Sequence, residues 1–399
     1  MSVSQQTARG GGRLFASTGV SLIGQGAVFA AVPLLAASLS SDPFWVSMAT
    51  AATYAAWLII GLPAGTLVDR WPLRPVMVWA DLIRAVLLAL LAVAVPSGAA
   101  SMSVVIGVVF ALSVAGCFFD PAAQAALPAV VGRNDAALAQ ANGRFWSLDT
   151  LGRSLLGPPL GAALFAASHM LPFALAVVTF VVSAVLLSGL PLNSEPRHAA
   201  TVSVWNSTRE GLTFLAREPR LRTLVAAMGA FNFGYNIAFA TLVLFALERL
   251  GLSQAGYGVL LAAPALGGVL GGFLSPKLQG RINPVTAYAA AFATQGAIWA
   301  LLGATESLWA TFPAMVVLGL ATNAVTVLGG TARQLLTPGV LLGRVSAATR
   351  VVGLGSAALG AALGGVIAHA WGLSAPLFVA TTVLVVASAC ALHMSRGWA

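Results

Sequence analysis

Charged side chains are scarce in this chain of 399 residues. Asp, Glu, Lys and Arg together make up 8% of it, whereas a soluble domain has about 25%. Hydrophobic residues make up 59%, and the mean hydropathy is +0.91. A soluble protein of this composition would lack the polar surface that keeps it dispersed. We therefore expect an integral membrane protein with lipid as its solvent.

Cysteine is almost absent, and so are the common catalytic motifs. Cys117 and Cys390 lie inside apolar runs, and no Cys/His spacing is present that would predict a metal site or a disulfide scaffold. The sequence has no Gly-x-x-x-x-Gly-Lys-Ser/Thr loop, which excludes an ATP-driven pump of that type. It also has no nucleophile/base pair. We expect no enzyme activity, no cofactor and no metal.

Acidic residues are outnumbered by basic ones, which gives a formal net charge of +9. The arginines punctuate apolar runs and do not gather on one polar face. This pattern is typical of the positive-inside rule and does not indicate nucleic-acid binding. We expect no nucleic-acid partner.

Long apolar runs fill the rest of the chain. A membrane-spanning helix needs about 20 predominantly apolar residues, and the hydropathy pattern predicts twelve of them, in an all-α membrane protein. The expected spans are 14–39, 44–68, 76–95, 102–125, 138–167, 172–190, 224–247, 257–275, 284–304, 309–331, 346–371 and 376–394.

The loop charges predict an orientation. If the N-terminus is cytoplasmic, Arg249 is the one basic residue in the external loops, so both termini are expected in the cytoplasm. The first apolar run is too long for a signal peptide. We expect four parts: a tail (1–13), a six-helix bundle (14–192), a cytoplasmic linker (193–222) and a second six-helix bundle (223–399). Within the linker, 204–216 is expected to form an amphipathic helix on the membrane surface.

The two halves are weakly similar to each other. Residues 157–161 match 360–364, and residues 65–69 match 271–275, at offsets of about half the chain. A shared offset favours a duplication, and hence two pseudo-symmetric bundles, which is a transporter architecture.

The segment Gly65-Thr-Leu-Val-Asp69-Arg70-Trp-Pro-Leu-Arg74 follows the second expected span. On the residues alone, an ordinary helix end with topogenic charges explains it as well as a functional loop does. The segment resembles the signature Gly-x-x-x-Asp-Arg-x-Gly-Arg-Arg of the major facilitator superfamily, with Pro72 and Leu73 in place of the usual Gly and Arg. The resemblance implies the twelve-helix major facilitator fold. It also implies a cytoplasmic gate role for Asp69 and Arg70.

Two further segments narrow the resemblance. Gly157-Pro158-Pro159-Leu-Gly161-Ala162 is similar to the Gly-Pro-x-x-Gly-Gly element of drug/proton antiporters, with Ala162 replacing the last glycine; a merely kinked helix is the alternative. Residues 118–128 and 80–85 resemble the branch of macrolide-efflux and enterobactin-exporter proteins. The basic residue common in that branch is Ala123 here, and the arginine motif expected in the fourth span is missing.

Ionisable residues within spans predict function, because burying them in the membrane is costly. The embedded acids Asp81, Asp120 and Asp149 lie in the first half, toward the expected cytoplasmic end. They are our candidates for proton coupling, with Asp149 preferred because it neighbours the antiporter-like element. Equally, they can form a gate network with a set of arginines. The gate and charge-network candidates are Asp69, Arg70, Arg74, Arg84, Arg144 and Arg153.

A central cavity is implied by the resemblance, lined mainly by spans one, four, seven and ten. The polar and aromatic residues expected near its middle are Gln25, Phe29, Tyr54, Trp57, Asn232, Tyr235, Asn236 and Asn323. Few polar groups on an apolar wall suit a hydrophobic or amphiphilic substrate.

The sequence thus predicts a secondary transporter that exports a drug-like molecule or secondary metabolite in exchange for protons. We expect a monomer, multi-pass in a bacterial plasma membrane, whose partners are a small-molecule substrate, protons and the lipid bilayer. The alternatives are a lysophospholipid or siderophore carrier of the same fold and, from another class, a non-transporting membrane sensor.

Overall fold

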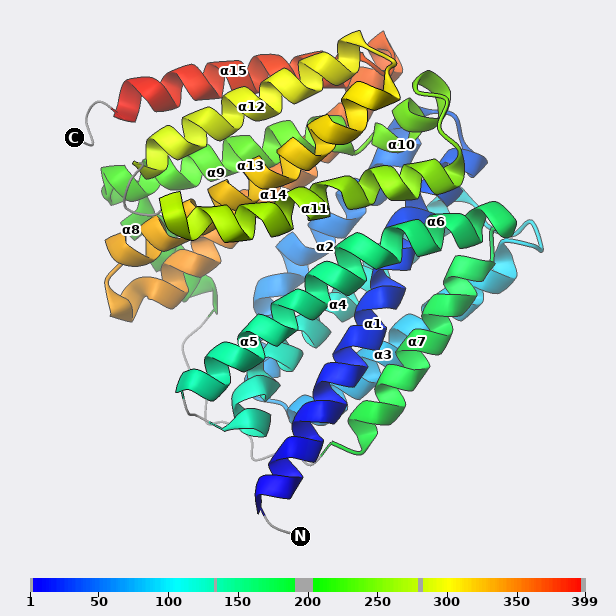
Figure 1. The fold of residues 1–399 in the computed structure, drawn as a ribbon. Coiled ribbons are helices and arrows are strands. Elements are labelled where there is room, and N and C mark those ends of the chain that lie inside the picture. Colours follow the sequence, from blue (N-terminus) through cyan, green and yellow to red (C-terminus); the bar gives the residue numbers. More distant parts are fainter. Residues whose placement is uncertain (1–2, 133–134, 191–203, 279–282, 396–399) are drawn as a thin grey trace. The chain divides into compact units, whose positions relative to one another are not determined.

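Helices form all the regular secondary structure in the part of the chain that the computed structural model describes, which is residues 3–132, 135–190, 204–278 and 283–395. Figure 1 shows long, gently curved helices joined by short turns. The expected all-α class is confirmed. The beginning of the expected linker, residues 193–203, lies outside the described residues.

Ten helices in these ranges are long and apolar enough to cross a bilayer. The count rises to eleven if Pro219–Phe239 and Leu242–Arg249, which meet at a bend of 42°, form one span. The span expected at 138–167 consists of three consecutive helical segments instead of one regular helix. These two interruptions account for the difference from the twelve predicted spans.

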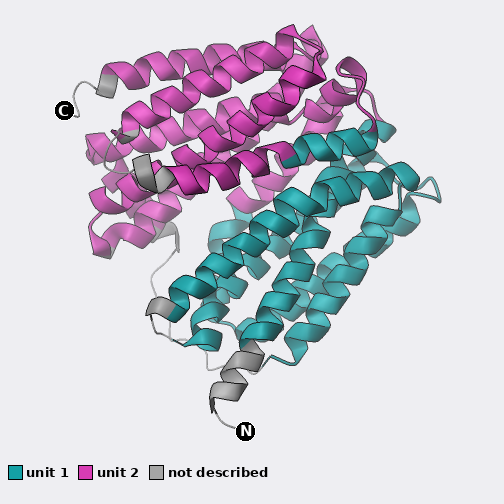
Figure 2. Cartoon of the chain, in the orientation of Figure 1, with its two compact units in different colours: residues 1–39, 59–201, 254–262 teal, residues 40–58, 202–253, 263–399 magenta. Residues whose placement is uncertain are grey.

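The described chain divides into two compact units (Figure 2). Residues 1–39, 59–201 and 254–262 form unit 1, and residues 40–58, 202–253 and 263–399 form unit 2. The helices α2 and α11 each contribute residues to both units. Their bounds are Pro43–Val68 for α2 and Gln254–Leu278 for α11.

Unit 1 is arranged around its first helix. Helix α1 packs against α4, α5, α6 and α7, and α3 packs against α4 and α7 (Figure 1). The bounds are α1 Val3–Leu39, α3 Leu73–Ala94, α4 Met102–Val131, α5 Asp135–Asp149, the π-helix η1 Thr150–Leu156, α6 Gly157–Ala167 and α7 Leu171–Ser188.

Small residues let α1 approach its neighbours closely. A Cβ on Gly157 of α6 would lie 2.5 Å from the Cα of Gly26, and one on Gly161 would lie 2.5 Å from the Cα of Ala27. Van der Waals packing at such contacts drives helix association in lipid, where the hydrophobic effect does not. These residues therefore fix the distance between α1 and α6.

Unit 2 pairs α9 with α14 and α12 with α15, and α13 packs on α12. Its helices are α8 Val204–Arg217, α9 Pro219–Phe239, α10 Leu242–Leu244, the π-helix η2 Phe245–Arg249, α12 Pro284–Ala304, α13 Leu308–Leu336, the 3₁₀-helix η3 Gly339–Leu341, α14 Leu342–Trp371 and α15 Ala375–Ser395.

The glycines that suggested a duplication occupy equivalent places in the two units. Gly157 and Gly161 press against α1, the first helix of unit 1. In unit 2, a Cβ on Gly360 would lie 2.5 Å from the carbonyl oxygen of Phe233, and one on Gly364 would clash with Ile237. Both of those partners belong to α9. The same small-residue spacing thus makes the same kind of helix crossing within each unit.

Helix α8 lies where the sequence predicts an amphipathic helix, and part of its apolar side is covered by protein. Leu215 joins a buried cluster with Val225 and Val345, and Gly211 abuts the backbone of Arg344. An ion pair between Glu210 and Arg344 reinforces this contact. At these residues the helix packs on α14 and α9, and its place on the membrane surface stays a prediction.

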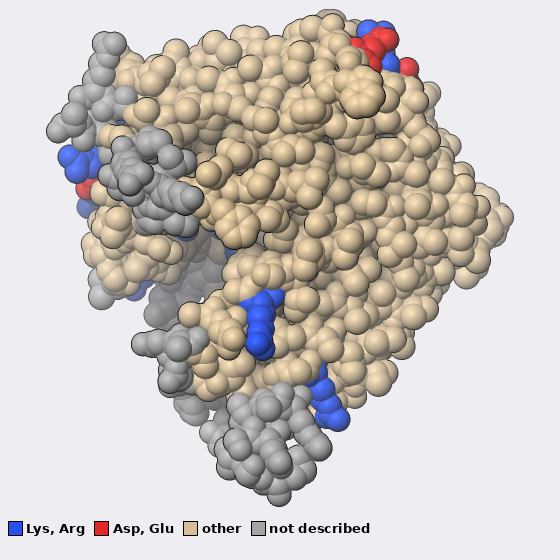
Figure 3. Space-filling view, viewed as in Figure 1, with Lys and Arg blue, Asp and Glu red and all other residues tan. Residues whose placement is uncertain are grey.

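The face of the molecule in Figure 3 carries few charged atoms. Lys, Arg, Asp and Glu form small isolated spots there, and uncharged side chains cover the remainder that is not drawn in grey. Exposed leucine, valine and tryptophan side chains occur on many helices. Such a surface is stable in lipid and unstable in water.

Replacing Gly161 with valine tests the close approach of α6 to α1. The added side chain has no room against Ala27, and overpacking of this kind costs about 1–3 kcal/mol. We expect a lower unfolding temperature for the purified protein in detergent. Gly107→Val in α4 is the matched control, because a Cβ there meets no atom within 4 Å. Equal losses in the two variants would contradict the proposed contact.

Candidate functional site

Arg153 of η1 binds two carboxylates in unit 1. Its Nε lies 3.0 Å from Oδ1 of Asp149, the last residue of α5, and its Nη2 lies 3.4 Å from Oδ2 of Asp120 in α4. The three side chains are partly buried, between 20% and 36% exposed. One arginine thus bridges two acids from different helices.

The π-helix that carries Arg153 follows from the two prolines after it. Pro158 and Pro159 have no backbone N–H, so the carbonyls one α-helical turn before them lose their usual partners. Over Thr150–Leu156 the backbone forms a π-helix, whose hydrogen bonds span five residues. At its end the N–H of Gly157 donates to the carbonyl of Gly152. Single π-helical turns of this kind are frequent at functional sites.

A second ion pair lies deeper in unit 1. Nη1 of Arg84 lies 3.3 Å from Oδ1 of Asp81, one turn earlier on α3, and both side chains are almost fully buried. The guanidinium also lies over the rings of Phe119 and Phe180, at 4.9 and 5.5 Å from their centroids. Burial without these partners would be very costly for either charge.

Hydrogen bonds connect this pair to a predicted cavity residue. Gln25 donates from Nε2 to Oγ of Ser21 over 3.3 Å, and that hydroxyl donates to Oδ1 of Asp81 over 3.4 Å. Gln25 is partly exposed, whereas Ser21 and Asp81 are buried. The polar path therefore runs from the surface of α1 into the interior of unit 1.

The buried pair Asp81–Arg84 and the group around Arg153 are electrostatically coupled, because Arg84 interacts with the charges of Asp120 and Arg153. The structure thus brings together the three embedded acids and two of the predicted arginines. Arg144 is exposed, and no ion pair joins it to these acids among the described residues.

The loop after α2 lies on the surface of unit 1. Asp69 and Arg70 are exposed in the turn between α2 and α3, and within the described ranges neither side chain forms a hydrogen bond or ion pair. Arg74 donates from Nη1 to the carbonyl of Leu190 over 3.4 Å, and Arg13 donates to the carbonyl of Gly189. These two arginines satisfy carbonyls at the C-terminal end of α7.

The antiporter-like element packs on both sides within unit 1. Gly157 and Gly161 contact α1, as described above. On another side, a Cβ on Gly258 of α11 would lie 2.7 Å from the carbonyl oxygen of Pro158. The element therefore joins α1, α6 and the first turns of α11.

The predicted cavity amides of unit 2 are largely engaged with their own helix. Asn232 donates from Nδ2 to the carbonyl of Met228 over 2.9 Å, and Asn236 donates likewise to Asn232 over 2.8 Å. The side chain of Tyr54 in α2 interacts with Asn236. In α13, the side chain of Asn323 lies against Gly271 of α11.

Aromatic rings surround these amides. Tyr235 stacks on Phe239 with centroids 5.0 Å apart and meets Trp299 edge-on at 6.1 Å. The guanidinium of Arg350 lies 5.9 Å from the ring of Trp57. In unit 1, Phe29 is 48% exposed on α1. Aromatic faces beside amides suit a ligand that is mostly apolar with a few polar groups.

Two further features of unit 2 lie outside the predicted site residues. Gln295 is fully buried, and neither of its amide atoms has a hydrogen-bond partner in the described part of the chain. Nδ1 of His369 lies 2.8 Å from Oδ1 of Asp42. Burial alone would raise the pKa of the Asp42 carboxyl, but hydrogen bonds from Phe44 N–H and His369 hold it below its usual value. A pairing 327 residues apart leaves no local signal in the sequence.

Comparison with known proteins decides the family. Residues 12–396 match the family model described as transmembrane secretion effector, a major facilitator family. The chain belongs to the major facilitator superfamily. The resemblance inferred from residues 65–74 is thereby confirmed at the level of the superfamily.

Relatives and solved structures agree with this assignment. An uncharacterised MFS-type transporter of Bacillus subtilis (strain 168), YkuC, is 24% identical over 328 residues, which cover 77% of this chain and 73% of YkuC. The nucleoside transporter NupG superposes with a TM-score of 0.79 at 13% identity, covering 96% of this chain and 99% of NupG. A bacterial homologue of the lysosomal transporter Spinster superposes with 0.75 at 16% identity, covering 99% and 98%.

The major facilitator fold is thus confirmed, and the protein is a multi-pass membrane transporter of this type. The family and the similar structures are transporters, which agrees with the absence of catalytic motifs from the sequence.

Loss of Arg84 tests how the buried pair contributes to stability. Arg84→Met leaves the Asp81 carboxylate buried without its partner, which costs about 3–5 kcal/mol. We expect the unfolding temperature in detergent to fall steeply. Adding Asp81→Asn to that variant removes the uncompensated charge, so the double variant is expected to recover part of the loss. An additive double variant would contradict the pairing, and Arg217→Met on exposed α8 is the control.

Proposed function

We propose that this transporter exports a hydrophobic or amphiphilic small molecule and takes up protons in exchange. The observation that carries the proposal is the charge balance of the network in unit 1. Three carboxylates, Asp81, Asp120 and Asp149, are accompanied by two guanidinium groups, Arg84 and Arg153. With every group ionised, the cluster carries one uncompensated negative charge.

A single excess negative charge suits reversible proton binding. An uncompensated charge within the membrane is costly, so one proton on the cluster makes it neutral at little structural cost. Arg153 holds both Asp120 and Asp149, and either acid can take that proton while the other keeps its ion pair. Asp149 is our preferred carrier, because it is bonded to the π-helix that leads into the antiporter-like element.

Protonation of Asp149 would weaken its contact with Arg153. The carbonyls of Gly152 and Arg153 pack against Gly26 of α1, so a shift of η1 would displace α1. Coupling between the proton and the substrate then passes from the acid through η1 to α1, which carries the predicted cavity residues Gln25 and Phe29. By this route the proton and the substrate would each favour a different position of α1. Exchange requires such a difference between the two bound states.

The character of the substrate follows from the predicted cavity residues. Tyr235 and Trp57 offer aromatic faces, and the amide nitrogens of Asn232 and Asn236 already donate within α9. Few free polar groups favour a substrate that binds mainly through apolar surface. We further propose that the protein acts as a monomer in a bacterial plasma membrane with both termini in the cytoplasm.

Transport is tested in everted membrane vesicles with an imposed pH gradient, in which the vesicle interior is acidic. The expected result is gradient-dependent accumulation of one or more hydrophobic antibiotics or dyes, abolished by a protonophore. Vesicles without the protein supply the background. No accumulation of any compound across a broad panel would overturn the proposal of proton-driven export.

The proton carrier is tested by Asp149→Asn in the same vesicles. Asparagine keeps the size of the side chain but cannot release a proton, so we expect loss of gradient-driven accumulation while binding of the compound persists. Glu306→Gln, an exposed acid 64% accessible in unit 2, is the control and should transport normally. Full transport by Asp149→Asn but none by Asp120→Asn would show that Asp120 carries the proton. Full transport by both single variants would contradict the role of the network.

A further inference from the structure

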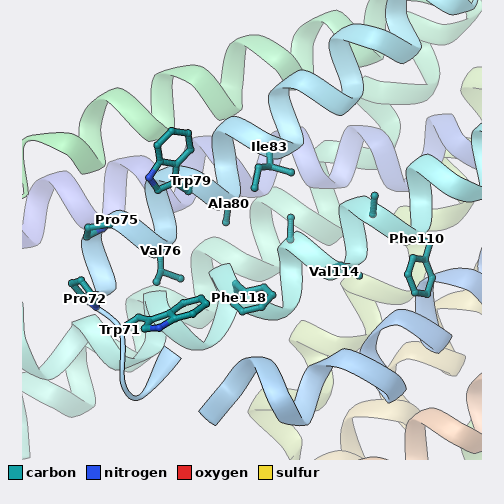
Figure 4. A pocket seen from close by; sticks show the side chains of 12 residues that line it. Trp71, Pro72, Pro75, Val76, Trp79, Ala80, Ile83, Phe110, Val114 and Phe118 are labelled. Carbon is teal, nitrogen blue, oxygen red and sulfur yellow. The ribbon is translucent and has the colours of Figure 1, made fainter. Parts of the chain in front are cut away.

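An apolar groove lies between α3 and α4 on the outside of unit 1. It encloses about 710 Å³. Trp71, Trp79 and Ile83 line it from one side, and Phe110, Val114 and Phe118 line it from the other (Figure 4). Trp79 is 64% exposed and Ile83 is 49% exposed, so the groove opens outward.

The lining of this groove offers nothing that could orient a polar ligand. Every residue that lines it is apolar or aromatic. Binding sites for small molecules usually place a few polar groups among the apolar ones to fix orientation. Its occupant must therefore present a long apolar surface to it, as an acyl chain does.

The length of the groove matches one leaflet of a bilayer. Along α3 the lining extends from Pro75, in the first turn, to Ile83, which is about 12 Å at 1.5 Å per residue, and Trp71 and Pro72 continue it before the helix begins. Along α4 it extends from Phe118 back to Phe110, about 12 Å. Half of a hydrocarbon core is about 15 Å, so the groove covers most of one leaflet. A chain anchored at the end near Trp71 would reach the middle of the membrane.

The end near Trp71 carries positive charge. Arg70 and Arg74 are exposed on either side of this tryptophan, and Asp69 is the acid beside them. Trp71 stacks on Phe118 with centroids 6.1 Å apart and an interplanar angle of 12°, which closes the groove at this end. Tryptophan and arginine are typical of the membrane interface, where lipid headgroups lie.

We propose that this groove binds an anionic phospholipid, with one acyl chain between α3 and α4 and the phosphate at Arg70 and Arg74. Charge complementarity selects an anionic lipid over a zwitterionic one, because the turn at residues 69–74 has two cations and one anion. The apolar groove holds the acyl chain, and the arginines select the charge of the headgroup. This site is built from residues of unit 1 and shares Arg70 and Arg74 with the predicted gate loop, but its test measures lipid retention and does not depend on the proposed export function.

The test is native mass spectrometry of the full chain in mild detergent, with added phosphatidylglycerol or phosphatidylethanolamine of identical acyl chains. We expect the wild type to retain phosphatidylglycerol preferentially. Arg70→Gln/Arg74→Gln should reduce that preference about fivefold for each arginine removed. Arg217→Gln on α8 is the charge control and should keep the preference. Equal retention of both lipids by the wild type would overturn the proposal in favour of unselective lipid contact.

A second variant tests the groove itself. Ala111→Trp fills the space beside Phe110 and should lower retention of both lipids. Leu90→Trp adds the same side chain at an exposed position of α3 outside the lining and should retain them. If Ala111→Trp gives no folded protein, Ile83→Trp takes its place, since the side chain of Ile83 is half exposed. Unchanged retention in a folded groove-filling variant would show that the acyl chain binds elsewhere.

Discussion

The rest of unit 1 depends on the close approach of backbones along α1. In lipid, apolar side chains gain nothing by leaving the solvent, so helices associate through packing and hydrogen bonds. Gly24 faces Thr179 of α7, and Gly26 faces the carbonyls of η1. These contacts bring α6, η1 and α7 to one helix. A bulkier residue in α1 would separate all three at once.

The charge network is a consequence of that packing. Asp120 and Arg153 meet because α4 and η1 both pack on α1. Arg84 is tolerated in the interior because aromatic rings of α4 and α7 cover it. Where water is excluded, such pairs hold helices in register, and their summed charge matters more than it would at a surface.

The sequence predicts those features that depend on neighbours along one helix. The span expected at 76–95 agrees closely with α3, because hydropathy alone decides a membrane helix. The pairs Asp81–Arg84 and Asp149–Arg153 follow from spacings of three and four residues. By contrast, Asp120–Arg153 joins two helices, and no spacing reports it.

Breaks in helices can likewise be predicted only where a local residue signals them. Pro158 and Pro159 gave a visible signal for irregular backbone, although the sequence does not say that a π-helix results. The bend after Phe239 has neither proline nor glycine at Ala240 and Thr241, so no local signal announces it. The contact of α8 with α14 was missed because an amphipathic helix fits a membrane surface and a protein surface equally well.

The π-helical segment η1 also makes this region unusual with respect to insertions and deletions. A wider turn accommodates one more residue than an α-helix of the same rise. Each residue of an α-helix rotates the chain by about 100°. Removing a single residue from Thr150–Leu156 would therefore let the helix close into a regular α-helix. Asp149 would then rotate by about 100° relative to α6, without any change in the charged residues themselves. A chain that is one residue shorter here would keep its charged residues but lose their present alignment with Asp120 of α4.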